Sequence, residues 1–485
     1  MLFNSYIFIF IYLPIVLGAF FAFCYFNLRK AAQLSLFVSS LAFYAYWDIR
    51  FLPLLCGSIV FNYVFGNLIY KASESNLRRV YLVASIALNL GLLFYFKYLN
   101  FFVTSLNFML PSEMNMINIV LPLGISFFTF TQIAYLVDVY QSKATPGGWD
   151  SYGLFVTVFP HLIAGPVLHH KEMITQFDDP KNYRWSSHNF AHGTFLFVMG
   201  LTKKVLIADN LFPFVSPVFD NGQTYIPFIQ AWIGALAYSI ELYFDFSGYS
   251  DMAIGLGLCF NIKLPLNFHS PYQATSIIDF WRRWHITLSN FLKDYLYIPL
   301  GGSRNGESSK LRNLLITMFL GGIWHGANWT FVIWGLCHGI FLSINHLWRK
   351  LNINIPHFLA HMLTLFCVVV AFAIFRSPNL TVAFEVIKGL FGLNGIVLPE
   401  SYEPKLAFLK YYGVIFKTLP MSNVHLTDLV MIIVSLLATL ILPNSMFWKE
   451  RFLRHPISWG VATFAAFMAC VVNLDAVTEF LYYQF

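Results

Sequence analysis

Long apolar runs recur along almost the whole chain and are separated by short polar connections. A helix needs about 20 apolar residues to cross roughly 30 Å of hydrocarbon, and runs of this length predict about eleven membrane spans. Backbone within lipid must satisfy its own hydrogen bonds, so continuous apolar runs form helices. The predicted spans cover residues 6–28, 32–49, 51–70, 80–98, 117–139, 188–208, 227–246, 328–347, 357–375, 427–443 and 457–474.

Three polar intervals interrupt this pattern. Two of them, residues 141–187 and 261–312, are rich in Pro, Gly, Arg, Lys, His and Trp. This composition predicts interfacial or re-entrant helices that pack on the bundle of membrane-spanning helices. Residues 396–426 are typical of an extramembrane loop. Because no repeat, low-complexity tract or linker separates a soluble part, we expect a single integrated membrane domain over residues 1–485.

Composition supports an all-α polytopic membrane protein. Of the 485 residues, 58% are hydrophobic and only 11% are charged, against about 25% charged in soluble globular domains. The net charge of +7 comes from cations that cluster in short connections, which indicates the positive-inside pattern rather than a nucleic-acid partner. This pattern predicts that the N-terminus lies outside and that two basic turns lie in the cytoplasm. One turn contains Arg29 and Lys30, and the other contains Lys71, Arg78 and Arg79.

One charge-free segment is too long for a single span. Residues 313–348 contain no Lys, Arg, Asp or Glu, yet one continuous helix would reach about 54 Å at 1.5 Å per residue. The helix must therefore break, and the natural break is Gly321-Gly322, followed by Gly326 and Asn328. This places His325 at a helix interruption, where irregular backbone lines a cavity rather than lipid.

Two interpretations of His325 remain open. It can be a core histidine bonded to a neighbouring carbonyl, or, flanked by Trp324 and Trp329, a general base that takes a proton from a hydroxyl. His338 would lie about 20 Å further along if the helix continued. We therefore interpret His338 as structural.

An aromatic and basic stretch, FWRRWH at residues 280–285, precedes a Gly turn at 301–302. Such a stretch is typical of an interfacial helix anchored by Trp and Arg. Alternatively, Arg282 and Arg283, with Arg304, attract a phosphate-bearing donor on the cytoplasmic side while His285 faces inward.

A cation or proton path and metal or cofactor chemistry have weaker support in the sequence. Glu241 and Asp245, four positions apart, could mark a cation or proton path, but we interpret them as structural hydrogen-bond anchors. The chain has no HExxH, no GxSxG, no P-loop and no paired metal-ligand spacing. We therefore expect no metal and no bound cofactor.

Several ordered motifs resemble the membrane-bound O-acyltransferase (MBOAT) superfamily, in particular its alginate O-acetyltransferase branch. That branch also includes enzymes that acetylate peptidoglycan and cellulose, and the teichoic-acid D-alanyl exporter. The motifs are YFDFSGYSDMAIG at 243–255, LPLNFHSPY at 264–272, FWRRWHITLS at 280–289, DYLYIPLGG at 294–302 and GGIWHGA at 321–327, with further matches at 121–130, 135–140, 159–166 and 375–376.

The resemblance implies a fold and a site. The fold would be a ring of about eleven tilted transmembrane helices with re-entrant and interfacial helices around a central tunnel. Its motif-rich catalytic region would lie at about 120–350. The Trp-His-Gly motif places the essential histidine of the family at His325, and the FWRRWH motif places a second at His285. At one position the chain departs from the family, because His161 stands where a Gln is usual.

The resemblance also implies an activity. The chain would move an acetyl group from a cytoplasmic thioester, acetyl-CoA, to a hydroxyl presented from outside the bacterial inner membrane. His325 would be the general base, and Trp324, Asn328 or His285 would stabilise the oxyanion. The acceptor would be a periplasmic SGNH-like partner or the polysaccharide itself. A transporter and a non-catalytic scaffold remain the alternatives.

Overall fold

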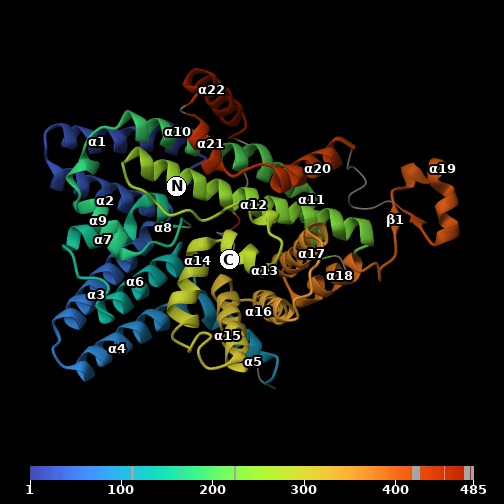
Figure 1. Cartoon of the computed structure of the whole chain (residues 1–485), viewed down its shortest axis with the longest axis horizontal. Helices are drawn as coiled ribbons and strands as arrows, with labels where there is room; N and C mark the ends of the chain where they lie inside the picture. The colour runs from blue at the N-terminus through green and yellow to red at the C-terminus, as the bar shows by residue number, and fades with distance from the viewer. Residues whose placement is uncertain are drawn as a thin grey trace. The chain divides into compact units, whose positions relative to one another are not determined.

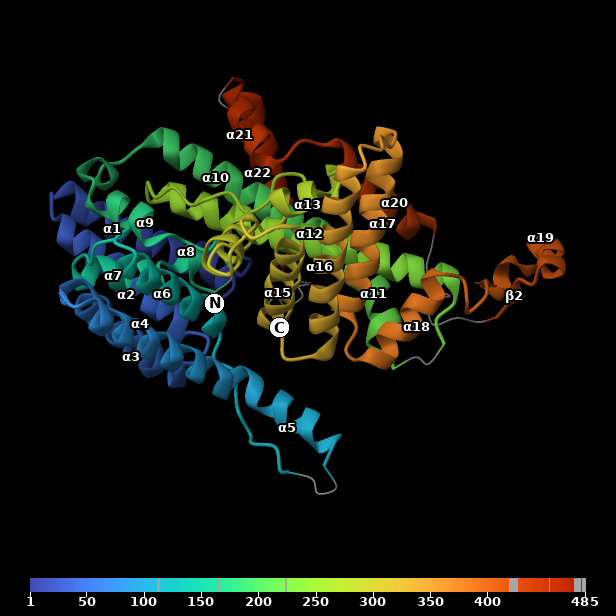
Figure 2. The same ribbon diagram turned by 60° about the horizontal axis from the view of Figure 1, so that its bottom comes forward.

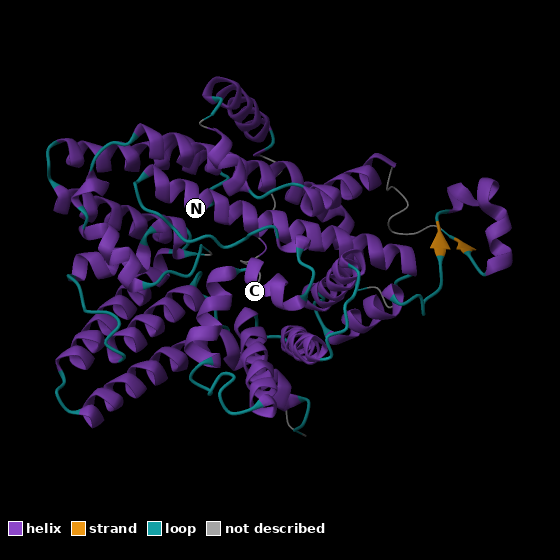
Figure 3. Ribbon diagram, viewed as in Figure 1, coloured by secondary structure: helices purple, strands orange, loops and turns teal. Residues whose placement is uncertain are grey.

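The computed structural model describes residues 1–110, 114–163, 165–222, 225–417, 426–452, 454–474 and 481, which are almost wholly helical (Figures 1 and 3). The strands within these ranges are β1 (Val397–Leu398) and β2 (Ile415–Phe416), which pair in parallel with Val397 opposite Ile415. This architecture confirms the expected all-α class. The strand pair lies in the interval predicted as an extramembrane loop, of which residues 418–425 lie outside the described part.

The chain divides into two compact units, each built from separate stretches of sequence. Unit 1 comprises Met1–Thr202, Gly248–Asn267 and Ser445–Val477, and unit 2 comprises Lys203–Ser247, Phe268–Asn444 and Thr478–Phe485. The long helix α12 (Phe228–Cys259) contributes its first part to unit 2 and the residues from Gly248 onward to unit 1. The single integrated domain expected from the sequence stays a prediction.

Unit 1 is a helical assembly around a core of phenylalanine rings. Phe3, Phe8, Phe43 and Phe159 contact one another, with centroids 5.0–6.5 Å apart. Its helices are α1 (Leu13–Tyr25), α2 (Arg29–Ala45), α3 (Leu52–Lys71), α4 (Ser75–Leu93), α5 (Leu99–Asn107), α6 (Ile125–Tyr140), α7 (Trp149–Thr157), α8 (Phe159–Leu162), α9 (His170–Asp178), α10 (Ser187–Thr202), α21 (Ser445–Phe452) and α22 (Pro456–Val472).

Unit 2 contains the histidine and tryptophan motifs. Its α15 and α16 lie side by side in both views and form an antiparallel pair, with Gly322 packed on Gly335 (Figures 1 and 2). Besides the first part of α12, its helices are α11 (Phe212–Phe219), α13 (Ile277–Arg283), α14 (Ile286–Leu292), α15 (Glu307–His325), α16 (Trp329–Lys350), α17 (His357–Arg376), α18 (Leu380–Leu390), α19 (Glu403–Leu406) and α20 (Leu426–Ile441).

Five helices in the described ranges are long and apolar enough to cross a membrane, or six when α20 and α21 count as one bent span. Other predicted spans coincide with shorter apolar helices, such as α6 and α22. The protein is therefore a multi-pass membrane protein, and the count of about eleven spans stays a prediction. The five are Phe8–Tyr25, Ile49–Lys71, Ser75–Asn107, Trp329–Lys350 and His357–Arg376.

Candidate active site

The junction between α15 and α16 positions His325. Helix α15 ends at His325, Gly326 is extended (φ −168°, ψ 158°), and the side chain of Asn328 caps α16 by accepting a hydrogen bond from the Thr330 backbone N–H at 3.1 Å. The predicted location of His325 at a helix interruption is confirmed.

The predicted position of the break itself is wrong. Gly321 and Gly322 lie inside α15, and the chain turns only after His325. A Cβ atom on Gly322 would lie 2.4 Å from the Phe331 carbonyl oxygen. Gly322 therefore serves close helix packing, and tertiary contact overrides its low helix propensity.

Aromatic rings enclose His325. Its side chain is buried, and its ring centroid lies 4.9 Å from that of Trp324, 4.9 Å from Trp334 and 5.3 Å from Phe375. All three of these aromatic residues are themselves buried. Trp329, which the sequence suggested as a flanking ring, is 49% exposed.

The second candidate histidine, His285, lies between α13 and α14 in a left-handed backbone conformation (φ 44°, ψ 53°). A non-glycine residue rarely adopts this conformation, and such residues cluster at functional sites. Its buried ring contacts Phe246, with centroids 4.8 Å apart. Burial lowers the pKa of His285 to about 3, so the ring is neutral at physiological pH.

Trp324 connects the two histidines. Its ring centroid lies 6.3 Å from His285 and 4.9 Å from His325. The structure thus brings together three residues that the sequence selected from two motifs about forty positions apart. A nonpolar, water-poor setting of this kind strengthens any hydrogen bond to a developing charge.

Sequence reasoning missed two members of the enclosure, Trp334 and Phe375. Both contact His325 because α16 returns beside α15 and α17 packs on α16. Trp334 and His338 are four positions apart on one face of α16, and this spacing could have revealed a shared surface. The Phe375-Arg376 match was a further signal.

His338 is buried and contacts tryptophans of α13 and α16, and its structural role stays a prediction. Its Nδ1 accepts a hydrogen bond from Trp281 Nε1–H at 3.2 Å, and its ring contacts Trp334 at 4.8 Å. Because the helix does not continue through residues 326–328, the separation of about 20 Å that a continuous helix would give does not apply. His338 instead lies beside Trp334, which contacts His325.

The two arginines of α13 differ in their surroundings. Arg283 Nε donates to Asp279 Oδ1 at 3.0 Å, an ion pair within the same helix, and both side chains are about 30% exposed. Arg282 is exposed and forms no ion pair within the described part of the chain. Arg282 is therefore the more available cation for a phosphate.

Two other predicted supporting residues have structural partners. The Asn328 amide donates to the Pro378 carbonyl at 2.7 Å in addition to capping α16, so both ends of its side chain are engaged. Asp245 is buried, pairs with Lys204 at 2.7 Å and accepts the Leu481 backbone N–H at 3.1 Å. These contacts are those of structural anchors.

Comparison with known proteins gives this geometry its context. A sequence model of MBOAT, the membrane-bound O-acyltransferase family, matches residues 151–378, which contain His285, Trp324, His325, Trp334 and Phe375. The peptidoglycan O-acetyltransferase of Helicobacter pylori is 46% identical over 439 residues, covering 84% of this chain and 83% of that protein. The chain belongs to the membrane-bound O-acyltransferase family.

Other relatives of this acyltransferase act on different polymers. The probable alginate O-acetylase AlgI of Pseudomonas aeruginosa is 42% identical, covering 84% of this chain and 78% of that protein. The teichoic acid D-alanyltransferase of Streptococcus thermophilus is 26% identical, covering 48% and 59%. Family membership makes the protein an O-acyltransferase and decides against the transporter and scaffold alternatives.

Proposed function

We propose that this acyltransferase transfers acetyl groups to hydroxyls of a bacterial cell-envelope polysaccharide. The observation that carries the proposal is the contact of Trp324 with both His325 and His285 inside the segment that matches the family. The names of the peptidoglycan and alginate relatives support acetyl as the group and a polysaccharide as the acceptor.

In the proposed reaction, neutral His325 removes the proton of the acceptor hydroxyl as its oxygen attacks the carbonyl carbon of a thioester. The carbonyl π bond becomes an oxyanion in a tetrahedral intermediate. When the intermediate collapses, the C–S bond breaks, and protonated His325 returns the proton to the departing thiolate. The products are the ester and the free thiol, and His325 ends the step neutral, so atoms and charge are conserved.

Two hydrogen-bond donors are proposed for the oxyanion. A neutral imidazole retains one N–H, and burial keeps His285 neutral. The indole of Trp324 carries a second N–H beside both histidines. A preorganised donor in a dry site contributes on the order of 3 kcal/mol to transition-state stabilisation.

The choice of acyl donor is based on the positive charge of α13. We propose acetyl-CoA as the cytoplasmic donor, with Arg282 and Arg283 near its phosphates. The enzyme would lie in the bacterial inner membrane and pass the acetyl group to a periplasmic SGNH-like partner or directly to the polysaccharide. No metal or bound cofactor takes part in this scheme.

The test compares full-length protein with His325→Ala. In cells, ester-linked acetate on each envelope polymer should fall to background without the gene and with the variant. Purified H325A should lose acetyl transfer by on the order of a hundredfold or more, because a positioned general base is removed. Thermal unfolding and membrane accumulation should remain near those of the original protein.

A matched control is His346→Ala on α16, a half-buried histidine outside the aromatic enclosure. It should retain transfer. Near-normal transfer by H325A, or an equal loss in H346A, would exclude the proposed role of His325.

A further inference from the structure

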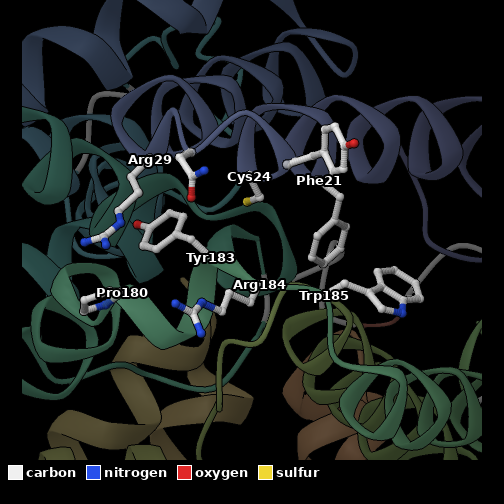
Figure 4. Close-up of a pocket in the computed structure, with 9 residues that line it drawn as sticks. Phe21, Cys24, Arg29, Pro180, Tyr183, Arg184 and Trp185 are labelled. Atoms are coloured by element: carbon white, nitrogen blue, oxygen red, sulfur yellow. The ribbon is translucent and has the colours of Figure 1, made fainter.

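Unit 1 carries a cavity of about 440 Å³ at the turn between α1 and α2, and none of the candidate active-site residues lines it (Figure 4). Arg29 at the start of α2 and Arg184 just before α10 both line it. In Figure 4 their guanidinium groups lie on one side of the cavity, and the rings of Phe21 and Trp185 lie on the other. The cavity therefore combines cations with aromatic surface.

The lining of this cavity carries two cations, and the carboxylates of Asp178 and Asp150 act on its Tyr183 from outside the lining. No carboxylate lines it, and within the described residues neither Arg29 nor Arg184 forms an ion pair. The nearby Asp150 is engaged by Lys30 at 2.5 Å. Paired guanidinium groups without carboxylate partners fit a phosphate, which accepts several charge-assisted hydrogen bonds.

A second hollow lies further toward the N-terminus along α1. An apolar groove of about 610 Å³ is lined by α1, α10 and α22, including Ile9, Leu13 and Leu17 from the α1 side. Its walls are hydrocarbon and aromatic except for hydroxyls such as that of Thr194. All of these elements belong to unit 1.

Aromatic contacts join the cavity to the groove. Phe21 and Trp185, which line the cavity, contact each other with centroids 4.9 Å apart. Trp185 also contacts Phe190 at 4.9 Å, and Phe190 lines the groove. The two hollows are thus neighbours on one surface, with the cations at one end.

The two hollows together extend along most of α1. They follow the chain from Ile9 to Tyr25, a distance of about 24 Å at 1.5 Å per residue. Phe8–Tyr25 is a candidate membrane span, so the apolar groove lies at hydrocarbon depth and Arg29 lies just beyond the span.

We propose that this surface binds one anionic phospholipid, with its phosphate between Arg29 and Arg184 and an acyl chain in the groove. The positive-inside pattern places the α1–α2 turn in the cytoplasm, so the lipid comes from the inner leaflet. This proposal goes beyond the acyl-transfer reaction and does not depend on it.

The experiment measures binding of phosphatidylglycerol to the full-length, detergent-purified protein by native mass spectrometry. Arg29→Gln with Arg184→Gln should weaken binding roughly tenfold or more, because two cations at the headgroup are lost. Gly460→Leu should also weaken it, because a Cβ at Gly460 meets no atom within 4 Å and a leucine there fills the groove.

The matched control is Lys171→Gln with Lys181→Gln, which removes two exposed positive charges that do not line the cavity and keeps the Lys30–Asp150 ion pair. It should leave binding nearly unchanged. Unchanged binding in the double arginine variant overturns the proposal. It is also overturned if G460L binds lipid normally while the arginine variant loses affinity for acetyl-CoA, since the cavity would then serve a soluble phosphate.

Discussion

The imidazole of His325 meets the indole of Trp334 almost at right angles, with ring centroids 4.9 Å apart and an interplanar angle of 86°. Nine positions separate the two residues, and the chain reverses between them. The orientation of the proposed base is therefore set by the returning helix α16. Any change that separates α15 from α16 should disturb the reaction before it unfolds the protein.

Gly322→Ala should separate these helices. The new Cβ would lie 2.4 Å from the Phe331 carbonyl oxygen, which belongs to backbone and cannot move aside cheaply. We expect a loss of roughly 1–3 kcal/mol of stability and a larger fractional loss of acetyl transfer. Thermal unfolding and transfer rates measure the two effects.

Gly321→Ala is the control for this prediction. Its Cβ would meet only the Leu292 side chain, at 3.1 Å, and that side chain can shift. If both glycine variants behave alike, close contact between α15 and α16 does not govern the site.

Replacing Arg282 and Arg283 together by Gln should raise the apparent KM for acetyl-CoA roughly tenfold while kcat changes much less, because phosphates are far from the reacting carbonyl. Asp279→Asn distinguishes binding from packing, since it breaks the Arg283 ion pair and keeps both cations. An effect of D279N equal to that of the double variant would indicate that the arginines only stabilise α13.

The turn between α3 and α4 should face the cytoplasm. Lys71, Arg78 and Arg79 motivate this topology, and Ser75 is exposed at the start of α4. Ser75→Cys should react with a membrane-impermeant maleimide only after cells are opened. Labelling of intact cells would reverse the predicted orientation.

His161 should make the protein sensitive to acid. Burial lowers the pKa of His161 to about 4, although its ring hydrogen-bonds to the Phe155 carbonyl at 3.1 Å. Above the ordinary histidine pKa of about 6.5 both folded and unfolded states are neutral. As pH falls from there toward 4, only the unfolded state gains the proton, and roughly 3 kcal/mol of stability is lost.

His161→Gln removes that titration, and Gln still offers an N–H for the Phe155 carbonyl. The decrease in melting temperature between about pH 7.5 and pH 5 should therefore be smaller in the variant. An unchanged decrease would mean that His161 is protonated in the folded protein.

How much of the site could be predicted depends on the range of the interactions. The two histidines and Trp324 came from local motifs, and the helix interruption at His325 came from the length of a charge-free segment. The partners of Asn328 and Asp245 could not be read in this way. Their partners, Pro378 and Lys204, lie about 40 to 50 positions away, and hydrogen-bond pairing at that separation is fixed only by folding.

The sequence by itself determined the membrane class, the helical architecture and the family, because hydropathy and ordered motifs are properties of the linear chain. Only the tertiary structure decided where α15 ends, because the packing of Gly322 against Phe331 and Gly335 outweighs the poor helix propensity of glycine. It also decided that Trp334 and Phe375 enclose His325. Those contacts arise because α16 returns beside α15 and α17 packs on α16, which no local pattern records.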